Sequence, residues 1–150
     1  EVMSVIEDHT AHYGTYNGNP LVARAVITVL RDVLTEDAYR HVNDLGEKLA
    51  GGYEDIMDDA GITGHVESVN SQGIVSFTDE RIESYRDFIA RVDEEFHENF
   101  WFGMLNRGVV PHPHHASQQW TISVQHEAEH VDEHLEAFKD IAPRLADEQP

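Results

Sequence analysis

The chain has 150 residues, 40% of them hydrophobic, with 29 acidic residues against 10 basic ones and a formal net charge of −19. This length allows one domain with a packed core, and the apolar content argues against intrinsic disorder. A field of this sign repels phosphate backbones and anionic lipid, so neither nucleic acid nor a membrane is an expected partner. The sequence contains no cysteine, which excludes disulfide frameworks, thiolate metal sites and cysteine nucleophiles.

Three further features bear on where the protein works. Only Lys48 and Lys139 are lysines, and their scarcity beside such an excess of acid suggests adaptation to high salt. No leader with a basic and then an apolar segment occurs, nor any apolar run of membrane-spanning length, and this favours the cytoplasm. The sequence opens on Glu1 rather than Met, so we expect it to be a piece of a longer protein.

Two helices are predicted in the first part of the chain. The run LVARAVITVLRDVL at 21–34 is apolar at nearly every position and predicts a helix buried on most of its sides. Asn19 is a suitable N-cap, and Pro20 suits the first helical position. A second helix is predicted at 36–60, weakened by Gly51-Gly52 and closed by Gly61.

Short strands and two further helices are predicted beyond this point. Runs that favour β-structure at 65–69 and 73–78 suggest a hairpin, and further strands are predicted at 109–110 and 120–124. Amphipathic helices are predicted at 83–106 and 127–145. Because helices and strands come in groups rather than in alternation, we expect an α+β fold with a small, mostly antiparallel sheet covered on one face.

The densest motif is the loop Gly14-Thr15-Tyr16-Asn17-Gly18-Asn19-Pro20, which lies directly before the first predicted helix. A loop of this kind can aim backbone amides and the Thr15 hydroxyl at an anion. The same residues are also typical of a capped turn that leads into a helix. Both interpretations remain open from spacing alone.

Histidines suggest a different kind of site. His126, His130 and His134 follow one another at four-residue steps, and Glu127 with His130 forms a Glu-x-x-His pair. One helix face could present them to a metal, or they could simply lie on a solvated acidic face. A non-enzymatic metal-binding or partner-binding module is therefore an alternative function. The loop histidines are open to the same two interpretations and are His112, His114 and His115.

Four segments together resemble the class III aminotransferases, which are pyridoxal-phosphate enzymes of fold type I, and in particular their aminomutase-like branch. The segments are GTYNGNPL at 14–21, HVESVNSQGIVSFT at 65–78, MLNRGVV at 104–110 and QQWTISVQH at 118–126. They follow the order of the family and extend over essentially the whole chain. The resemblance implies the end of the large domain at 1–34, followed at 35–150 by the C-terminal small domain with a three- or four-stranded sheet.

The resemblance also implies functional roles. Gly14 and Thr15 would hold the phosphate of pyridoxal 5'-phosphate bound to the neighbouring subunit of a homodimer. The Schiff-base lysine of the family would lie upstream, so this chain alone would not transfer amino groups between small-molecule amino and carbonyl compounds. Gln118 stands where the aminomutases carry a glutamate and would be a residue of the substrate rim, or else a simple strand-edge residue. Glu127 replaces the threonine that usually caps the last helix.

Overall fold

The computed structural model describes residues 14–16, 18–112 and 118–149. Contacts between residues divide the chain into one unit up to Tyr39 and a second from Arg40 onward. The first unit contains α2 (Pro20–Thr28) and the π-helical segment η1 (Val29–Val33). The second unit contains most of α3 (Glu36–Ala60) and every later element.

The first helix begins as the sequence predicts but continues differently. The Asn19 side chain accepts hydrogen bonds from the N–H groups of Leu21 and Val22, and Pro20 occupies the first turn. The α-helix gives way to π-helix at Val29, so one regular helix to residue 34 is a wrong prediction. No residue of α2 or η1 is buried within this chain, and Leu21 is 80% exposed, so burial of this helix against the rest of a larger protein stays a prediction.

Helix α3 supplies one wall of the core. Thr35 caps it, since its Oγ1 accepts from the N–H of Ala38 at 3.2 Å. The helix ends as predicted at Gly61, which has a φ of +74° and is followed by the buried Ile62. Its inward residues recur at three- and four-residue steps and are Val42, Leu45, Leu49, Tyr53 and Met57.

The sheet has three antiparallel strands in the order β1 (His65–Val69), β2 (Gln72–Ser76) and β3 (Gln118–Thr121). The predicted hairpin is confirmed, with Val69 opposite Gln72 and Asn70 in the left-handed region at a φ of 55°. The last strand comes two residues earlier than predicted. Val109 and Val110 are not a strand: the Val109 N–H bonds back to the Met104 carbonyl, which closes the preceding helix.

The helix predicted at 83–106 is two helices, α4 (Tyr85–Arg91) and α5 (Glu94–Leu105). The break comes at Val92, which is extended with a ψ of 125°, and at Asp93. The Asp93 carboxylate then accepts from the Phe96 N–H at 3.0 Å and starts the second helix. The helical spacing of apolar residues continues across Val92 and Asp93 without interruption, and for this reason the pattern predicts a single helix.

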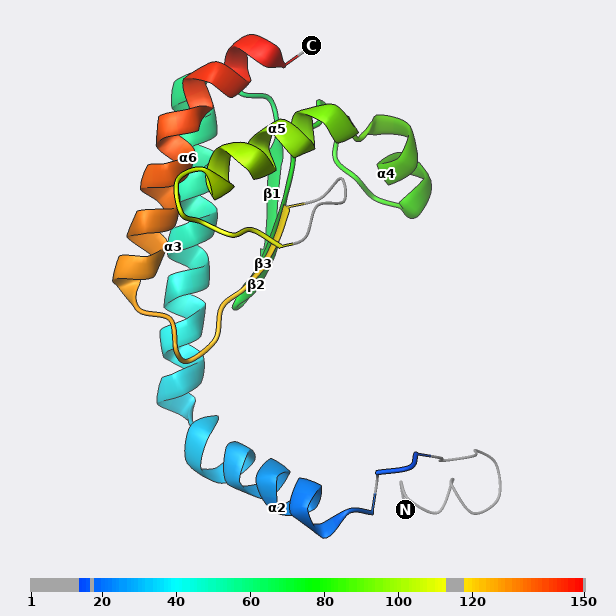
Figure 1. The fold of residues 1–150 in the computed structure, drawn as a ribbon, viewed down its shortest axis with the longest axis vertical. Helices are drawn as coiled ribbons and strands as arrows, with labels where there is room; N and C mark the ends of the chain where they lie inside the picture. The colour runs from blue at the N-terminus through cyan, green and yellow to red at the C-terminus, as the bar shows by residue number, and fades with distance from the viewer. Residues whose placement is uncertain (1–13, 17, 113–117, 150) are drawn as a thin grey trace. The chain divides into compact units, whose positions relative to one another are not determined.

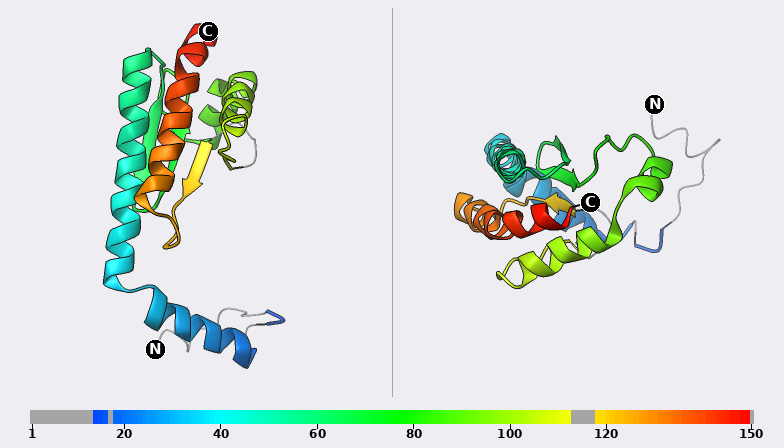
Figure 2. Two further views of the ribbon diagram at one scale, coloured as in Figure 1. Left: turned by 60° about the vertical axis from the view of Figure 1, so that its left-hand side comes forward. Right: turned by 90° about the horizontal axis from the view of Figure 1, so that it is seen from above.

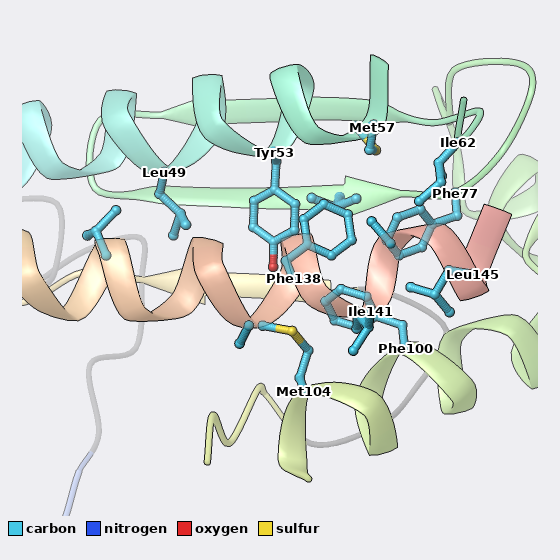
Figure 3. Packing of buried hydrophobic residues seen from close by; sticks show 14 of the residues in the cluster. Leu49, Tyr53, Met57, Ile62, Phe77, Phe100, Met104, Phe138, Ile141 and Leu145 are labelled. Carbon is cyan, nitrogen blue, oxygen red and sulfur yellow. The ribbon is translucent and has the colours of Figure 1, made fainter. Parts of the chain in front are cut away.

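The core lies between the sheet and its covering helices. Helix α6 (Ala128–Glu148) lies beside α3 against one face of the sheet, and α5 packs on α6 (Figures 1 and 2). Aromatic rings fill the centre, with Phe100 and Phe138 fully buried and 5.6 Å apart between ring centroids (Figure 3). Among the residues that the structure describes, no helix is both long and apolar enough to span a membrane.

Candidate functional site

The loop before α2 is open to solvent. Gly14, Thr15 and Tyr16 are all exposed, and the Asn19 N–H donates to the Tyr16 carbonyl at 3.0 Å. The Asn19 side chain already satisfies the first helical amides, so the loop is a capped turn as one interpretation predicted. Among the described residues, no hydrogen-bond partner is recorded for the Thr15 hydroxyl. The turn is therefore compatible with an anion site, because its hydroxyl remains available.

The donors of this loop suit a phosphate. An exposed threonine hydroxyl beside backbone amides supplies hydrogen bonds that strengthen when the acceptor is charged. The loop 14–20 contains no lysine or arginine, so a phosphate here would be held by neutral donors. Asn17 of the same loop lies outside the described residues.

Neither lysine has the surroundings of a covalent catalyst. The Lys48 ammonium pairs with the Asp132 carboxylate and donates to the Ala128 carbonyl at 3.4 Å. Lys139 lies on the exposed side of α6. A nucleophilic lysine is activated by a lowered pKa in an apolar or cationic pocket, and an acidic partner has the opposite effect.

Gln118 begins β3, where its backbone pairs with Val75 of the central strand. The predicted substrate-rim residue is thus at the start of an ordered strand. The loop before it, including the candidate ligands His114 and His115, lies outside the described residues.

His130 and His134 of α6, together with His126 just before it, border a cavity of about 330 Å³ that the sequence did not predict. Its inner wall contains Tyr53, whose hydroxyl is 2.6 Å from Nε2 of His134, and Trp120, whose ring stacks on Tyr53 at 5.6 Å. Burial lowers the pKa of His134 to about 4 and raises the pKa of Tyr53 well above its usual range. Both groups are therefore neutral near pH 7, and the Tyr53 hydroxyl donates to the imidazole.

At each of the two outer histidines of this cavity, one backbone hydrogen bond favours a particular tautomer. The backbone N–H of Ser123 donates to Nδ1 of His126 at 3.1 Å, and that of Glu127 donates to Nδ1 of His130 at 2.9 Å. An acceptor nitrogen carries no proton, so in each neutral ring the proton is on Nε2. The His130 bond belongs to a capping box at the start of α6, in which the ring accepts from the backbone N–H of the N-cap residue Glu127.

This arrangement does not favour the alternative metal-binding function. An Nε2 that carries a proton has no lone pair to offer a metal, and Nδ1 is already used. Within 14–16, 18–112 and 118–149, no three histidine or acidic side chains are grouped as ligands for a metal ion.

Comparisons with known proteins agree with the motifs, although no family model matches the chain. It is 32% identical over 132 residues to a glutamate-1-semialdehyde 2,1-aminomutase of Aquifex aeolicus, and 34% identical over 127 residues to one of Thermus thermophilus. These matches cover 88% and 83% of this chain but only 31% and 29% of the relatives. The chain thus spans about a third of their length.

Solved structures show the same relation. A glutamate-1-semialdehyde aminomutase from Pseudomonas aeruginosa matches with a TM-score of 0.79 and 25% identity, over 92% of this chain and 30% of that one. An omega-transaminase from Sphaerobacter thermophilus shares the fold, with a TM-score of 0.76 over 97% of this chain and 34% of that one, at 23% identity.

The α+β unit is therefore the fold of a C-terminal domain of the fold type I aminotransferases. The family recognised from the motifs is confirmed as well: over the segment that it spans, this chain is a relative of the glutamate-1-semialdehyde aminomutases and class III transaminases.

Proposed function

We propose that this chain is the C-terminal part of a pyridoxal-phosphate-dependent aminotransferase or aminomutase. The complete enzyme would move an amino group between small amino and carbonyl compounds in the cytoplasm. The names of the relatives support this reaction class, and a second Pseudomonas structure is described as a complex with PMP. In this division, residues 1–34 end the large domain and residues 35–150 form the small domain.

The exposed Thr15 hydroxyl carries the proposal. It lies in a loop before a helix, beside glycine, and no described residue accepts or donates to it. We assign Gly14 and Thr15 to the cofactor phosphate of the neighbouring subunit in a homodimer. When bound, the cofactor supplies an electron sink for carbanion formation, and this chain contributes phosphate donors and a wall of the site. Gln118 would contribute a neutral amide to the substrate rim.

Removal of the Thr15 hydroxyl tests the assignment. In the protein expressed with its upstream coding region, Thr15→Ala should weaken retention of pyridoxal phosphate about tenfold or more, since a hydrogen bond to a charged group contributes about 1.5–3 kcal/mol. Absorbance after dialysis measures retention. Thr63→Ala is the matched control, because Thr63 is exposed and its recorded hydrogen bonds use only backbone atoms. Equal retention in both variants would remove Thr15 from the site.

Hybrid dimers test whether the site is shared. Subunits carrying Thr15→Ala, mixed with subunits whose upstream Schiff-base lysine is replaced, should regain activity in the mixed dimer, because one of its two sites is then intact. If Thr15 acted within its own subunit, every site of the mixture would keep one defect and no activity would return. This chain by itself should show no amino transfer, since neither of its lysines is suited to the covalent step.

A further inference from the structure

The cavity beside α6 has the composition of a small-molecule site. It lies wholly within the unit that begins at Arg40, and its volume of about 330 Å³ is within the usual range for ligand pockets. One side is apolar and aromatic, formed by Leu49, Tyr53, Val110, Trp120, Ile122 and Val131. The other side is lined by histidines, of which His134 is half-buried and His126 and His130 are exposed at the mouth.

Two histidines at the cavity, His126 and His130, offer hydrogen-bond donors. With Nδ1 of His126 and of His130 each engaged by a backbone N–H, both rings present Nε2–H. In the part of the chain that the structure describes, neither Nε2–H has a recorded partner. The ring centroids of His126 and His130 are 6.1 Å apart, so the two rings are neighbours at this end of the cavity.

Trp120 forms part of the apolar wall of the cavity. The indole N–H of Trp120 is buried and, among the described residues, has no hydrogen-bond partner. Because this nitrogen has almost no accessible surface, a ligand in the cavity cannot reach it, and Trp120 contributes its apolar ring to the wall. Trp120 is fixed against Tyr53 and against Gly73, where a side chain would collide with the indole ring.

Charge narrows the ligand class. No lysine or arginine lines the described walls, so a phosphate dianion would lack compensation here. The amino end of the 21-residue helix α6 adds a favourable dipole for one negative charge at His130, its third residue. The apolar wall requires a ligand body that is also apolar.

We propose that this cavity binds a small organic carboxylate, with the carboxylate on the Nε2–H groups of His126 and His130 and the apolar body against Trp120 and Leu49. The site would belong to this chain alone and does not depend on the proposed enzymatic function. It would therefore persist if Thr15 proved to have no part in cofactor binding.

Titration of this chain with benzoate at neutral pH tests the proposal. Benzoate is a monocarboxylate with a flat apolar body and should bind with a dissociation constant of about 1 mM. Calorimetry and ¹H–¹⁵N chemical-shift changes report the binding. Benzamide, which has the same shape without the charge, and inorganic phosphate should each bind at least about tenfold more weakly. Equal binding of benzamide or phosphate, or no binding of benzoate, would overturn the assignment.

Asparagine substitutions remove the donors and leave the local fold in place. The Oδ1 of asparagine replaces Nδ1 as acceptor for the backbone N–H but provides nothing at the position of Nε2. The pair His126→Asn and His130→Asn should weaken benzoate binding about tenfold. His65→Asn is the matched control, because His65 lies outside the cavity and bonds to the Asp79 carbonyl. Unchanged affinity in the double variant would contradict the proposal.

A second measurement does not depend on any variant. Long-range ¹H–¹⁵N spectra distinguish the two neutral imidazole tautomers, and both His126 and His130 should show the proton on Nε2 at neutral pH. Benzoate should shift these two imidazole resonances and leave that of His65 in place. The Nδ1–H form at either ring, or shifts confined to other residues, would exclude the carboxylate contact.

Discussion

His97 places a titratable ring inside the apolar core. It is 2% exposed, its centroid is 5.2 Å from that of Phe77, and among the described residues neither ring nitrogen has a hydrogen-bond partner. Burial lowers the pKa of His97 to about 4, and the nearby Asp93 carboxylate offsets this only in part. The folded protein therefore keeps this ring neutral under conditions in which the unfolded chain protonates it.

Acid should destabilise the protein through this residue. Above about pH 6.5 the ring is neutral in both states, so His97 gives no pH dependence there. As the pH falls from about 6.5 to 4, only the unfolded state gains the proton, and the free energy of unfolding decreases by up to about 3 kcal/mol. Below about pH 4 both states are protonated and the decrease levels off.

Urea denaturation at several pH values, with His97→Phe beside the parent, isolates this contribution. Phenylalanine suits the site beside Phe77 and Phe96 and removes two unpaired nitrogens, so it should raise the free energy of unfolding by about 1–3 kcal/mol at neutral pH. The difference in free energy of unfolding between the variant and the parent should increase as the pH falls from about 6.5 to 4. His134, with its own lowered pKa, titrates in both proteins and cancels in the difference. If the difference in free energy of unfolding between His97→Phe and the parent did not change with pH, the assignment would be refuted.

The sequence alone indicated some residues of the candidate sites and missed others. The Gly-Thr loop could be recognised because its candidate phosphate-binding residues are adjacent in the sequence. The pair of Tyr53 and His134 could not, since 81 positions separate the two residues and only the packing of α3 on α6 joins them. The histidine spacing was visible, but its meaning depended on which nitrogen the backbone engages, and this is a property of the folded turn.

At the level of elements, glycines set how closely α3 approaches its neighbours. A Cβ at Gly46 would overlap the carbonyl oxygen of Asn70 in the β1–β2 turn, and one at Gly52 would collide with the Leu135 side chain of α6. A Cβ at Gly51 would meet no atom within 4 Å. Of the pair Gly51-Gly52, which lowers the helix propensity of this segment, close packing therefore requires Gly52 and does not require Gly51.

Alanine at two positions of the same helix should therefore have opposite effects. Gly46→Ala should lower the free energy of unfolding by about 1–3 kcal/mol, because a backbone atom cannot move aside as a side chain can. Gly51→Ala should raise it by up to about 1 kcal/mol through helix propensity alone. Denaturation midpoints at constant slope measure both. Tolerance of Gly46→Ala would show that the turn does not limit α3, and destabilisation by Gly51→Ala would contradict the open space at that position.

The elements themselves were predictable where one periodic signal dominated. Helix α3, its glycine stop and the β1–β2 hairpin are as predicted, because capping and turn residues agree with the apolar pattern. Prediction failed where a local hydrogen bond overrode that pattern, at the Asp93 cap and at the return of Val109 to Met104. The π-helical turn at Val29 left no signal in composition.

On the scale of the whole molecule, two properties oppose each other. The net charge of −19 makes copies of the chain repel one another at low salt. The first unit exposes large apolar side chains on α2 and η1, with Leu21 at 80% and Leu30 at 60%. In the proposed enzyme, the remaining domain and the partner subunit would cover this surface. Without them it favours association, and salt determines which effect prevails.

This chain should therefore self-associate more strongly as salt rises, because screening removes the repulsion and leaves the apolar attraction. Sedimentation velocity from low to molar salt measures it. Combining Leu21→Gln with Leu30→Gln should keep the chain monomeric throughout. Val69→Gln with Val110→Gln, equally exposed positions of the second unit at 75% and 74%, should not. If both pairs of substitutions had the same effect, the association would be nonspecific. If the parent chain stayed monomeric at molar salt, the exposed apolar side chains of α2 and η1 would not drive association.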